Sequence, residues 1–225
     1  MLTERVFRTQ TVFGNRLPRC ARTHCDLDFS DDVCVQFLLH ILCRGGTIFL
    51  PGRSIEDVVS TFLDLKVEAV VAVPPGLARY LQFFEQHGSL RGSLDTILCV
   101  GGPLSPALSK RVRARLSPNL IAAYGWAETG TAAAAPAHAI ADVPGAAGFV
   151  TPGLSVEAVD DSGKALPPGT AGRLRIRGPY VLANYWDAAT AGGALRDGWF
   201  YPGERGSVSA DNLLVLAKPD SGAGP

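Results

Sequence analysis

The chain has 225 residues, of which 47% are hydrophobic and 19% charged, so it can bury a sizeable core and is not disordered by composition. Its 21 Lys and Arg residues balance its 21 Asp and Glu residues. This balance argues against broad binding to nucleic acid or to an anionic membrane, which both need excess positive charge, and it favours a small-molecule ligand.

The apolar segments and the cysteines indicate a cytoplasmic protein. The longest apolar run, residues 33–43, is too short and too polar to span a bilayer. Residues 1–18 lack the apolar core of a secretory signal. The cysteines form no Cys-x-x-Cys pair, and we expect them to be reduced and mostly buried. They are Cys20, Cys25, Cys34, Cys43 and Cys99.

From about residue 30, helical periodicity alternates with short apolar runs. Ser54 and Ser105 are expected to cap helices, and Gly45 and Gly88 to end them. Asp31 or Asp32 is expected near the cap of the first of these helices. Short apolar strands separated by helices predict a parallel sheet covered on both faces. The predicted order is helix 31–46, strand 47–50, helix 54–65, strand 68–73, helix 74–88, strand 96–100, a helix opened by Ser105 and Pro106, and strand 119–123.

After about residue 148, Gly and Pro become frequent and helical periodicity disappears. Four runs in this part have the pattern of antiparallel strands joined by turns. They are residues 154–160, 172–178, 206–210 and 213–217. The predicted organisation is an α/β part with a parallel sheet flanked by helices (1–150), a smaller β-rich subdomain (151–220) and a flexible tail (221–225).

Two loops with unusual residues follow predicted strands, and in a parallel sheet both open on one edge. The sequence "GGPLSP" (101–106) offers bare backbone at Gly101 and Gly102. The sequence "YGWAETG" (124–130) offers Tyr124, whose ring can stack on a planar base, and Gly125 beside it. Glu128 can hold a divalent cation near a phosphate. Each residue taken singly also fits a structural role, as a turn, a packed aromatic or a solvated acid.

Five motifs occur here in an order and spacing that resemble the adenylate-forming, or AMP-binding, superfamily. They are "VGGPLSPAL", "YGWAETG", "GRLRIRGPYVLANYW", "GWFYPGERGSV" and "LLVLAKPD". The superfamily includes acyl- and aryl-CoA synthetases and the adenylation domains of peptide synthetases. The resemblance implies part of an acyl-CoA synthetase-like fold. It also implies that a carboxylic acid attacks the α-phosphate of ATP, with Mg²⁺ present, before the acyl group passes to coenzyme A or a carrier-protein thiol.

The resemblance also implies roles for single residues. Tyr124 would stack on adenine, Gly101 and Gly102 would line the adenine and acid pockets, and Glu128 would reach magnesium. Glu204 stands where the family has an aspartate that clamps the ribose hydroxyls.

Three positions depart from the family pattern. The first is Glu204 itself, whose side chain is one methylene longer than aspartate. Lys218 replaces an arginine that assists the ribose contact. Ala127 replaces a threonine that contacts phosphate, unless Thr129 or Thr131 compensates. Together these departures suggest a tuned or weakened site.

The acid pocket is less well determined. By resemblance, Pro74 lies near it, and Trp126 is expected either to form its wall or to belong to the core. An aspartate in "DLDFSDD" (Asp28, Asp31 or Asp32) fits either an amino-acid ammonium group or a helix cap. We assign His40 and His138 structural roles.

Two family features are missing from the sequence. We find no Ser/Thr/Gly-rich phosphate loop, and the chain ends before the domain that carries the family's catalytic lysine. We therefore expect little turnover from this polypeptide by itself. Two alternatives stay open: a non-catalytic adenylate- or nucleotide-binding module, and one piece of a split ligase that needs a complementary chain or self-associates.

Overall fold

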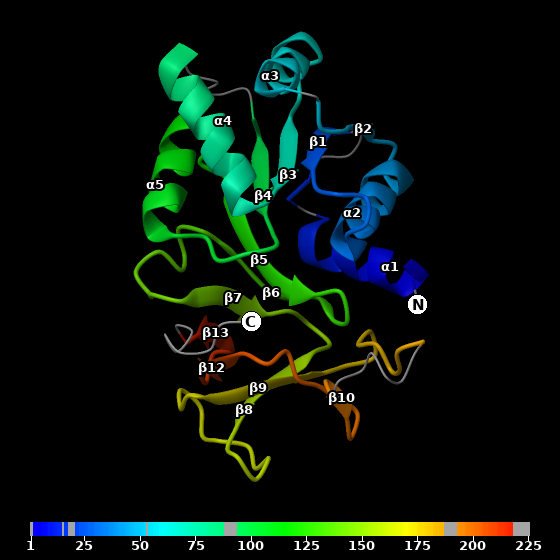
Figure 1. The fold of residues 1–225 in the computed structure, drawn as a ribbon, viewed down its shortest axis with the longest axis vertical. Coiled ribbons are helices and arrows are strands. Elements are labelled where there is room, and N and C mark those ends of the chain that lie inside the picture. Colours follow the sequence, from blue (N-terminus) through cyan, green and yellow to red (C-terminus); the bar gives the residue numbers. More distant parts are fainter. Residues whose placement is uncertain are drawn as a thin grey trace.

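The computed structural model describes residues 2–14, 16–17, 21–52, 54–87, 94–186 and 193–217, with side chains from residue 6 onward (Figure 1). The helices are α1 (Leu2–Phe13), α2 (Asp32–Cys43), α3 (Ile55–Asp64), α4 (Pro74–His87) and α5 (Pro106–Arg115). The strands are β1 (Arg22–Asp26), β2 (Thr47–Phe49), β3 (Ala69–Ala72), β4 (Thr96–Cys99), β5 (Leu120–Trp126), β6 (Gly130–Pro136), β7 (Ala146–Val150), β8 (Ser155–Val159), β9 (Gly172–Arg177), β10 (Leu195–Arg196), β11 (Trp199–Phe200), β12 (Arg205–Val208) and β13 (Leu213–Leu216).

The strands form one mixed sheet. Its hydrogen-bonded order is β10-β11-β9-β12-β13-β7-β6-β5-β4-β3-β1-β2, with β8 paired to β9. The run β5-β4-β3-β1-β2 is parallel throughout. The predicted parallel sheet with flanking helices is therefore confirmed.

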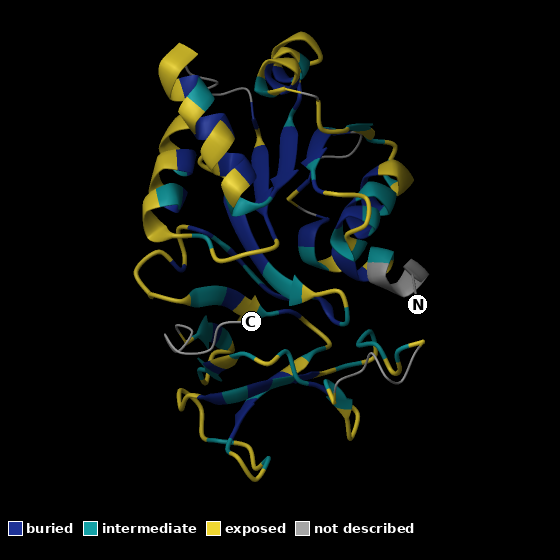
Figure 2. Ribbon diagram, in the orientation of Figure 1, coloured by how far each residue is buried: buried dark blue, intermediate teal, exposed yellow. Residues whose placement is uncertain are grey.

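Helices cover both faces of the parallel part, as expected for continuous apolar strands (Figures 1 and 2). Alternate residues of β3 point to opposite faces. Val70 and Ala72 pack in a cluster with buried residues of α3, α4 and α5. Ala69 and Val71 pack in a second cluster with residues of α1 and α2. All four residues of β3 are buried.

Two of the predicted helix caps are confirmed. Ser54 accepts a hydrogen bond from the Asp57 amide, and Asp57 accepts one from the Ser54 amide, which completes a capping box. Ser105 accepts from the Leu108 amide at the start of α5, with Pro106 in the first turn. Asp31 has the cap position of α2 but makes no side-chain cap bond. Gly88 lies outside the described residues.

The antiparallel part starts earlier than the change of sequence texture near residue 148. It begins at β6, which forms a hairpin with β5. The predicted strands are found as β8, β9, β12 and β13. They enclose a third apolar cluster centred on Val156, Leu174, Ile176 and Phe200. The ladder runs from β5 through β6, β7 and β13 to β12 and β9 without interruption.

Strand β1 was not predicted, because four of its five residues are polar or charged. It nevertheless lies between β2 and β3, and Thr23 and His24 are fully buried. The Nε2 atom of His24 lies 3.1 Å from the Tyr80 hydroxyl, and its ring packs edge-on against Phe62. Burial lowers the pKa of His24 to about 4, against an opposing effect of Asp26, so the ring is neutral at pH 7. The hydrogen bond to Tyr80 and the aromatic packing accommodate the His24 ring in the core, while Thr23 Oγ1 and His24 Nδ1 are buried without a hydrogen-bond partner among the described residues.

The described cysteines are free thiols. Cys25, Cys34 and Cys99 are buried and Cys43 is exposed, while Cys20 lies outside the described residues. Within the described part of the chain, no helix is long and apolar enough to cross a membrane.

Candidate functional site

The loop after β4 lies against the start of α4. Gly101 has φ +72°, in the left-handed region that favours glycine, and a Cβ there would approach Val73 to 3.0 Å. At Gly102 a Cβ would meet only Pro74, at an ordinary contact distance of 3.6 Å. The packing of the protein therefore does not demand glycine at position 102, and both glycines are exposed. Gly101, Gly102 and Pro74 are thus brought together at the carboxyl edge of the sheet.

Residues 124–126 are not a loop, contrary to the sequence interpretation. They continue β5, and only residues 127–129 form the turn to β6. The parallel pairing of β4 with β5 ends at Cys99 and Ala122, and the segments with Gly101 and Tyr124 each follow within two residues of this pair. The two predicted segments therefore lie on adjacent strands, at the same edge.

Gly125 has a structural reason of its own. A Cβ at this position would lie 2.0 Å from the carbonyl oxygen of Gly130 across the hairpin. The ladder also shifts register between Tyr124 and Gly125, which brings the two backbones close together. Glycine is therefore required here by the β5–β6 hairpin, whether or not a ligand approaches.

Three predicted site residues form one hydrogen-bonded group, which we call the Trp–Tyr–Glu group. The Tyr124 hydroxyl donates to Oε2 of Glu204, 80 residues away in sequence. The indole Nε1 of Trp126 donates to the Tyr124 hydroxyl at 3.1 Å. Burial, followed by the bond to Glu204, raises the pKa of Tyr124, so the hydroxyl keeps its proton and remains a donor.

The surroundings hold the members of the Trp–Tyr–Glu group in place. The ring of Trp126 is tilted against Phe200 of β11, with 6.2 Å between centroids, and 38% of Trp126 is exposed. The backbone carbonyl of Glu204 accepts from the Leu174 amide at 2.9 Å, which ties Glu204 to β9. Tyr124 packs against the apolar cluster of the antiparallel part. Trp126 therefore has one face in contact with protein and a large exposed part.

Glu128 lies in the turn and contacts a different segment. Its Oε1 accepts from the Tyr185 hydroxyl at 2.7 Å, and its backbone carbonyl accepts from the Leu182 amide at 2.8 Å. Burial, followed by the hydrogen bond to Glu128, raises the pKa of Tyr185 to about 12. The described residues contain no group of three or more His, Cys, Asp or Glu that could hold a metal. A single carboxylate still fits Mg²⁺, which proteins often hold through one or two carboxylates together with substrate phosphates.

The two threonines considered as replacements for the hydroxyl missing at Ala127 differ in position. Thr129 is fully buried, and its hydroxyl donates to Gly130 O at 2.8 Å and accepts from the Trp126 amide at 3.1 Å. That hydroxyl is used within the turn. The carbonyl of Thr131 accepts from Arg8 at 2.7 Å, and its side chain is half-buried.

Two of the three "DLDFSDD" aspartates considered for an ammonium group, Asp28 and Asp32, have local side-chain partners. Asp28 accepts from the backbone and the hydroxyl of Ser30, and these bonds lower the pKa of its carboxyl. Asp32 accepts from the Gln36 side chain. Asp31 stands at the start of α2, as described above. Lys218 lies outside the described residues.

Sequence reasoning missed two residues that support the site. Arg8 is buried and joins α1 to the hairpin region through Thr131 O and the Thr151 hydroxyl. Nothing in the sequence of α1 pointed to this contact across more than 120 positions. Tyr185, the partner of Glu128, lies in the quoted motif "GRLRIRGPYVLANYW" and could have been singled out there.

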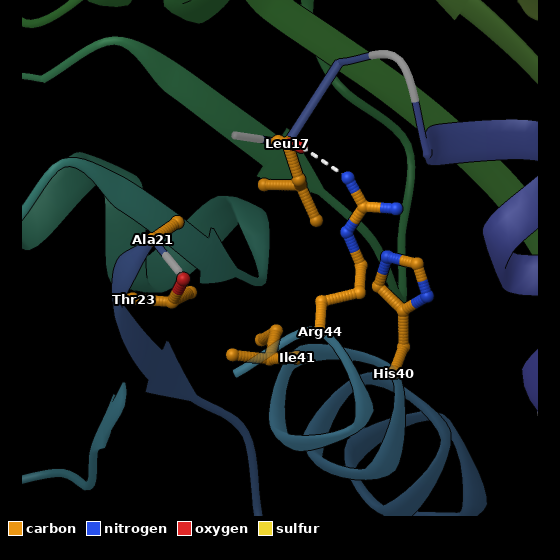
Figure 3. A pocket seen from close by; sticks show the side chains of 6 residues that line it. All are labelled: Leu17, Ala21, Thr23, His40, Ile41 and Arg44. Carbon is orange, nitrogen blue, oxygen red and sulfur yellow. Dashed lines mark hydrogen bonds between the residues drawn. The ribbon is translucent and has the colours of Figure 1, made fainter. Parts of the chain in front are cut away.

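The cavity of about 10 Å³ shown in Figure 3 lies elsewhere, at the amino end of β1. It has room for about one water molecule and none for a substrate. Burial, followed by the charge of Arg44, lowers the pKa of His40 to about 4. The cavity is lined by Leu17, Ala21, Thr23, His40, Ile41 and Arg44. His40 is therefore a neutral core residue, as predicted.

Comparison with known proteins gives consistent matches. A family model described as AMP-binding enzyme matches residues 2–186. Feruloyl-CoA synthase of Amycolatopsis is 31% identical over 190 residues, which is 81% of this chain and 37% of that protein. The fatty acid–[acyl-carrier-protein] ligase ScoC of Streptomyces coeruleorubidus is 34% identical over 181 residues, or 77% of this chain and 35% of that protein. The chain thus spans little more than a third of these relatives' length.

Solved structures agree with the fold. The amide bond synthetase McbA of Marinactinospora thermotolerans superposes with a TM-score of 0.83 at 26% identity, covering 96% of this chain and 44% of that one. The O-succinylbenzoate coenzyme A synthetase MenE of Bacillus subtilis, in complex with ATP and magnesium, gives a TM-score of 0.81 at 21% identity, with the same coverages. The second likeness shows the fold alone.

Proposed function

Because the chain belongs to the family of AMP-binding enzymes, we propose that it takes part in AMP-forming activation of a small carboxylic acid. In this reaction a carboxylate oxygen attacks the α-phosphorus of ATP, and pyrophosphate leaves. The resulting acyl-adenylate is then attacked by a thiol at its carbonyl carbon, which gives a thioester and releases AMP. Coenzyme A or a carrier-protein thiol is the proposed acceptor, as in the names of several relatives.

The observation that carries this proposal is the placement of the predicted residues on adjacent strands. The exposed Gly101–Gly102 backbone and the Trp–Tyr–Glu group lie at the carboxyl edge of β4 and β5. Open α/β sheets bind ligands at this edge. In an adenylate, an aromatic ring suits the adenine and a carboxylate suits the ribose. Bare backbone leaves a path along which the adenine can approach.

Each residue has a proposed role in holding the adenylate. The Tyr124 ring stacks on adenine while Gly101 and Gly102 let the nucleotide approach the backbone. The Glu204 carboxylate accepts the ribose hydroxyls, and Lys218 assists that contact. Pro74 and the exposed part of Trp126 border the acid. These residues contribute mainly by positioning two anions, the substrate carboxylate and ATP, that would otherwise repel each other.

Glu128 is the proposed magnesium ligand, and when bound the ion would neutralise charge on the phosphates. Glu128→Gln keeps an oxygen to accept from Tyr185 but removes the negative charge. We expect this variant to lose most of the magnesium dependence of ATP binding while its thermal unfolding stays near that of the wild type. Glu157→Gln, on β8, is the matched control. Unchanged magnesium dependence in Glu128→Gln would remove Glu128 from the site.

The decisive experiment is calorimetric titration with a non-hydrolysable acyl-sulfamoyl adenosine, run beside ATP with magnesium. Tyr124→Ala is expected to weaken binding of the adenylate mimic by about 1–3 kcal/mol, by analogy with base stacking on aromatic side chains. Phe7→Ala is the matched control, because it removes an exposed ring from α1. Failure of the wild-type chain to bind either ligand would refute the proposed function.

A second candidate is a non-catalytic adenylate-binding module. It is favoured by the turn after β5, where Ala127 carries no hydroxyl and the Thr129 hydroxyl is buried in the turn. Tight binding of the adenylate mimic together with weak ATP binding is the expected pattern of this module. A split ligase gives a different result, because a complementary chain would restore ATP-dependent thioester formation.

A further inference from the structure

The direction of the hydrogen bonds in the Trp–Tyr–Glu group follows from chemistry. Indole Nε1 can only donate, an ionised carboxylate can only accept, and a phenol can do both. Trp126 therefore donates to Tyr124, and Tyr124 donates to Glu204. A phenol that receives a hydrogen bond becomes a better donor to the next group. The two hydrogen bonds of the Trp–Tyr–Glu group therefore run in one direction, from Trp126 through Tyr124 to the Glu204 carboxylate.

The chain of bonds leaves part of the Glu204 carboxylate available. Tyr124 contacts Oε2, and among the described residues no hydrogen bond or ion pair reaches Oε1. A carboxylate has about four lone-pair sites, of which the phenol takes one. The remaining sites can accept two neighbouring hydroxyl groups. Glu204 itself is half-buried, so part of the residue remains exposed to solvent.

Glu204 needs this support because its side chain is long. A glutamate carboxylate has one more rotatable bond than an aspartate, and fixing it costs conformational entropy when a ligand binds. Here the backbone of Glu204 is already tied to β9 through Leu174, and Tyr124 ties the other end of the side chain. A carboxylate that is fixed before binding loses less freedom on binding.

We propose that Tyr124 and Trp126 are positioning residues that orient Glu204 toward a vicinal diol. The Tyr124 hydroxyl, as distinct from its ring, thereby sets the selectivity of the site for a ribose over a sugar that lacks these hydroxyls. This inference rests on the proposed function, since it takes the diol to be the ribose of the adenylate. Tyr124 then has two separable roles, because its ring faces the base and its hydroxyl faces Glu204.

The test compares AMP with 2′,3′-dideoxy-AMP, titrated calorimetrically in magnesium-free buffer so that Glu128 contributes little. Tyr124→Phe keeps the ring and removes the hydroxyl. We expect the AMP affinity to fall about tenfold, the scale of a hydrogen bond to a charged group. The affinity for 2′,3′-dideoxy-AMP should stay within about twofold of the wild-type value, because this ligand offers Glu204 no hydroxyls. Trp126→Phe should give a smaller loss of the same selectivity.

A double-mutant cycle separates positioning from a merely structural effect. In a Glu204→Gln background, Tyr124→Phe should have little further effect on AMP affinity, since the charged partner is already gone. Tyr201→Phe is the matched control, because its hydroxyl interacts with Arg175 rather than with the Trp–Tyr–Glu group. Thermal unfolding of each variant shows whether it is folded before titration.

The outcomes are distinct. Equal losses for both nucleotides in Tyr124→Phe, or fully additive losses in the cycle, would overturn the inference while the proposed function stands. If the folded wild-type chain binds neither AMP nor the adenylate mimic, the proposed function fails and the inference fails with it. If Tyr124→Phe does not fold, Trp126→Phe still tests the selectivity for the diol, because it removes only the first donor of the chain of bonds.

Discussion

Two glycines of the candidate site, Gly125 and Gly102, should respond in opposite ways to the same substitution. In Gly125→Ala the new Cβ would lie 2.0 Å from Gly130 O, 2.8 Å from Gly130 C and 3.0 Å from the amide nitrogen of Ala132. All three are backbone atoms, so no side chain can turn away to relieve the contact. In Gly102→Ala the nearest atoms are those of the Pro74 ring, at 3.6 Å.

The magnitudes follow from these distances. The β5–β6 strands would have to separate by more than about 1 Å at Gly125 to reach ordinary van der Waals contact. Overpacking of this kind costs about 1–3 kcal/mol, and the loss of one or two ladder hydrogen bonds adds about 1–2 kcal/mol. We therefore expect Gly125→Ala to lower the free energy of unfolding by about 2–5 kcal/mol. Gly102→Ala should change it by about +0.4 to +1 kcal/mol, because alanine restricts the unfolded chain.

Chemical unfolding by urea, followed by circular dichroism, measures both effects from the shift of the midpoint at constant slope. Titration with the adenylate mimic then tests the folded Gly102→Ala protein, whose affinity should fall if the nucleotide approaches bare backbone there. A Gly125→Ala protein as stable as the wild type would refute the hairpin argument. Wild-type affinity in Gly102→Ala would remove Gly102 from the site.

Two further predictions concern the core. Phe62→Ala removes a ring that is 2% exposed, and we expect it to lower the free energy of unfolding in urea by about 3–5 kcal/mol. Leu63→Ala, at its exposed neighbour, should lower this free energy by less than about 0.5 kcal/mol. Similar values for the two variants would contradict the assigned packing of α3. The pKa of His40 is about 4 in the fold and 6.5 unfolded, so the unfolded state binds more protons and stability falls as the pH drops from about 6.5 to 4. Urea midpoints across this range should show a smaller decline in His40→Gln than in the wild type, and an equal decline in both proteins would contradict the assigned burial of His40.

The sequence predicted the parallel half of the fold because local and global signals agree there. The runs that became β3 and β4 are apolar throughout, and Ser54 and Ser105 mark the starts of α3 and α5. Such signals are local, and the tertiary structure did not override them. The segment of β1 gave no such signal, because its burial depends on Tyr80 and Phe62, which lie far away in sequence.

The candidate site was predictable in its residues but not in its contacts. The motifs singled out Tyr124, Trp126 and Glu204, yet the hydrogen bonds that join them span up to 80 positions and left no local trace. The extension of β5 through Trp126 was also hidden. Its partner β6 is mostly alanine, which favours no strand by itself, so the pairing depends on neighbouring β7 and on the glycines of the hairpin.

The unbroken ladder from β2 to β9 has a mechanical consequence for the site. Tyr124 belongs to β5 and Glu204 directly precedes β12, and four pairings (β5–β6, β6–β7, β7–β13 and β13–β12) connect these strands. A continuous backbone hydrogen-bond ladder therefore joins the two sides of the site, and we expect them to move together. Amide hydrogens of β5, β6, β7 and β13 should exchange with solvent through one shared opening event rather than in two independent steps. We therefore expect any movement of the site toward a ligand to come from side chains and from the turn after β5.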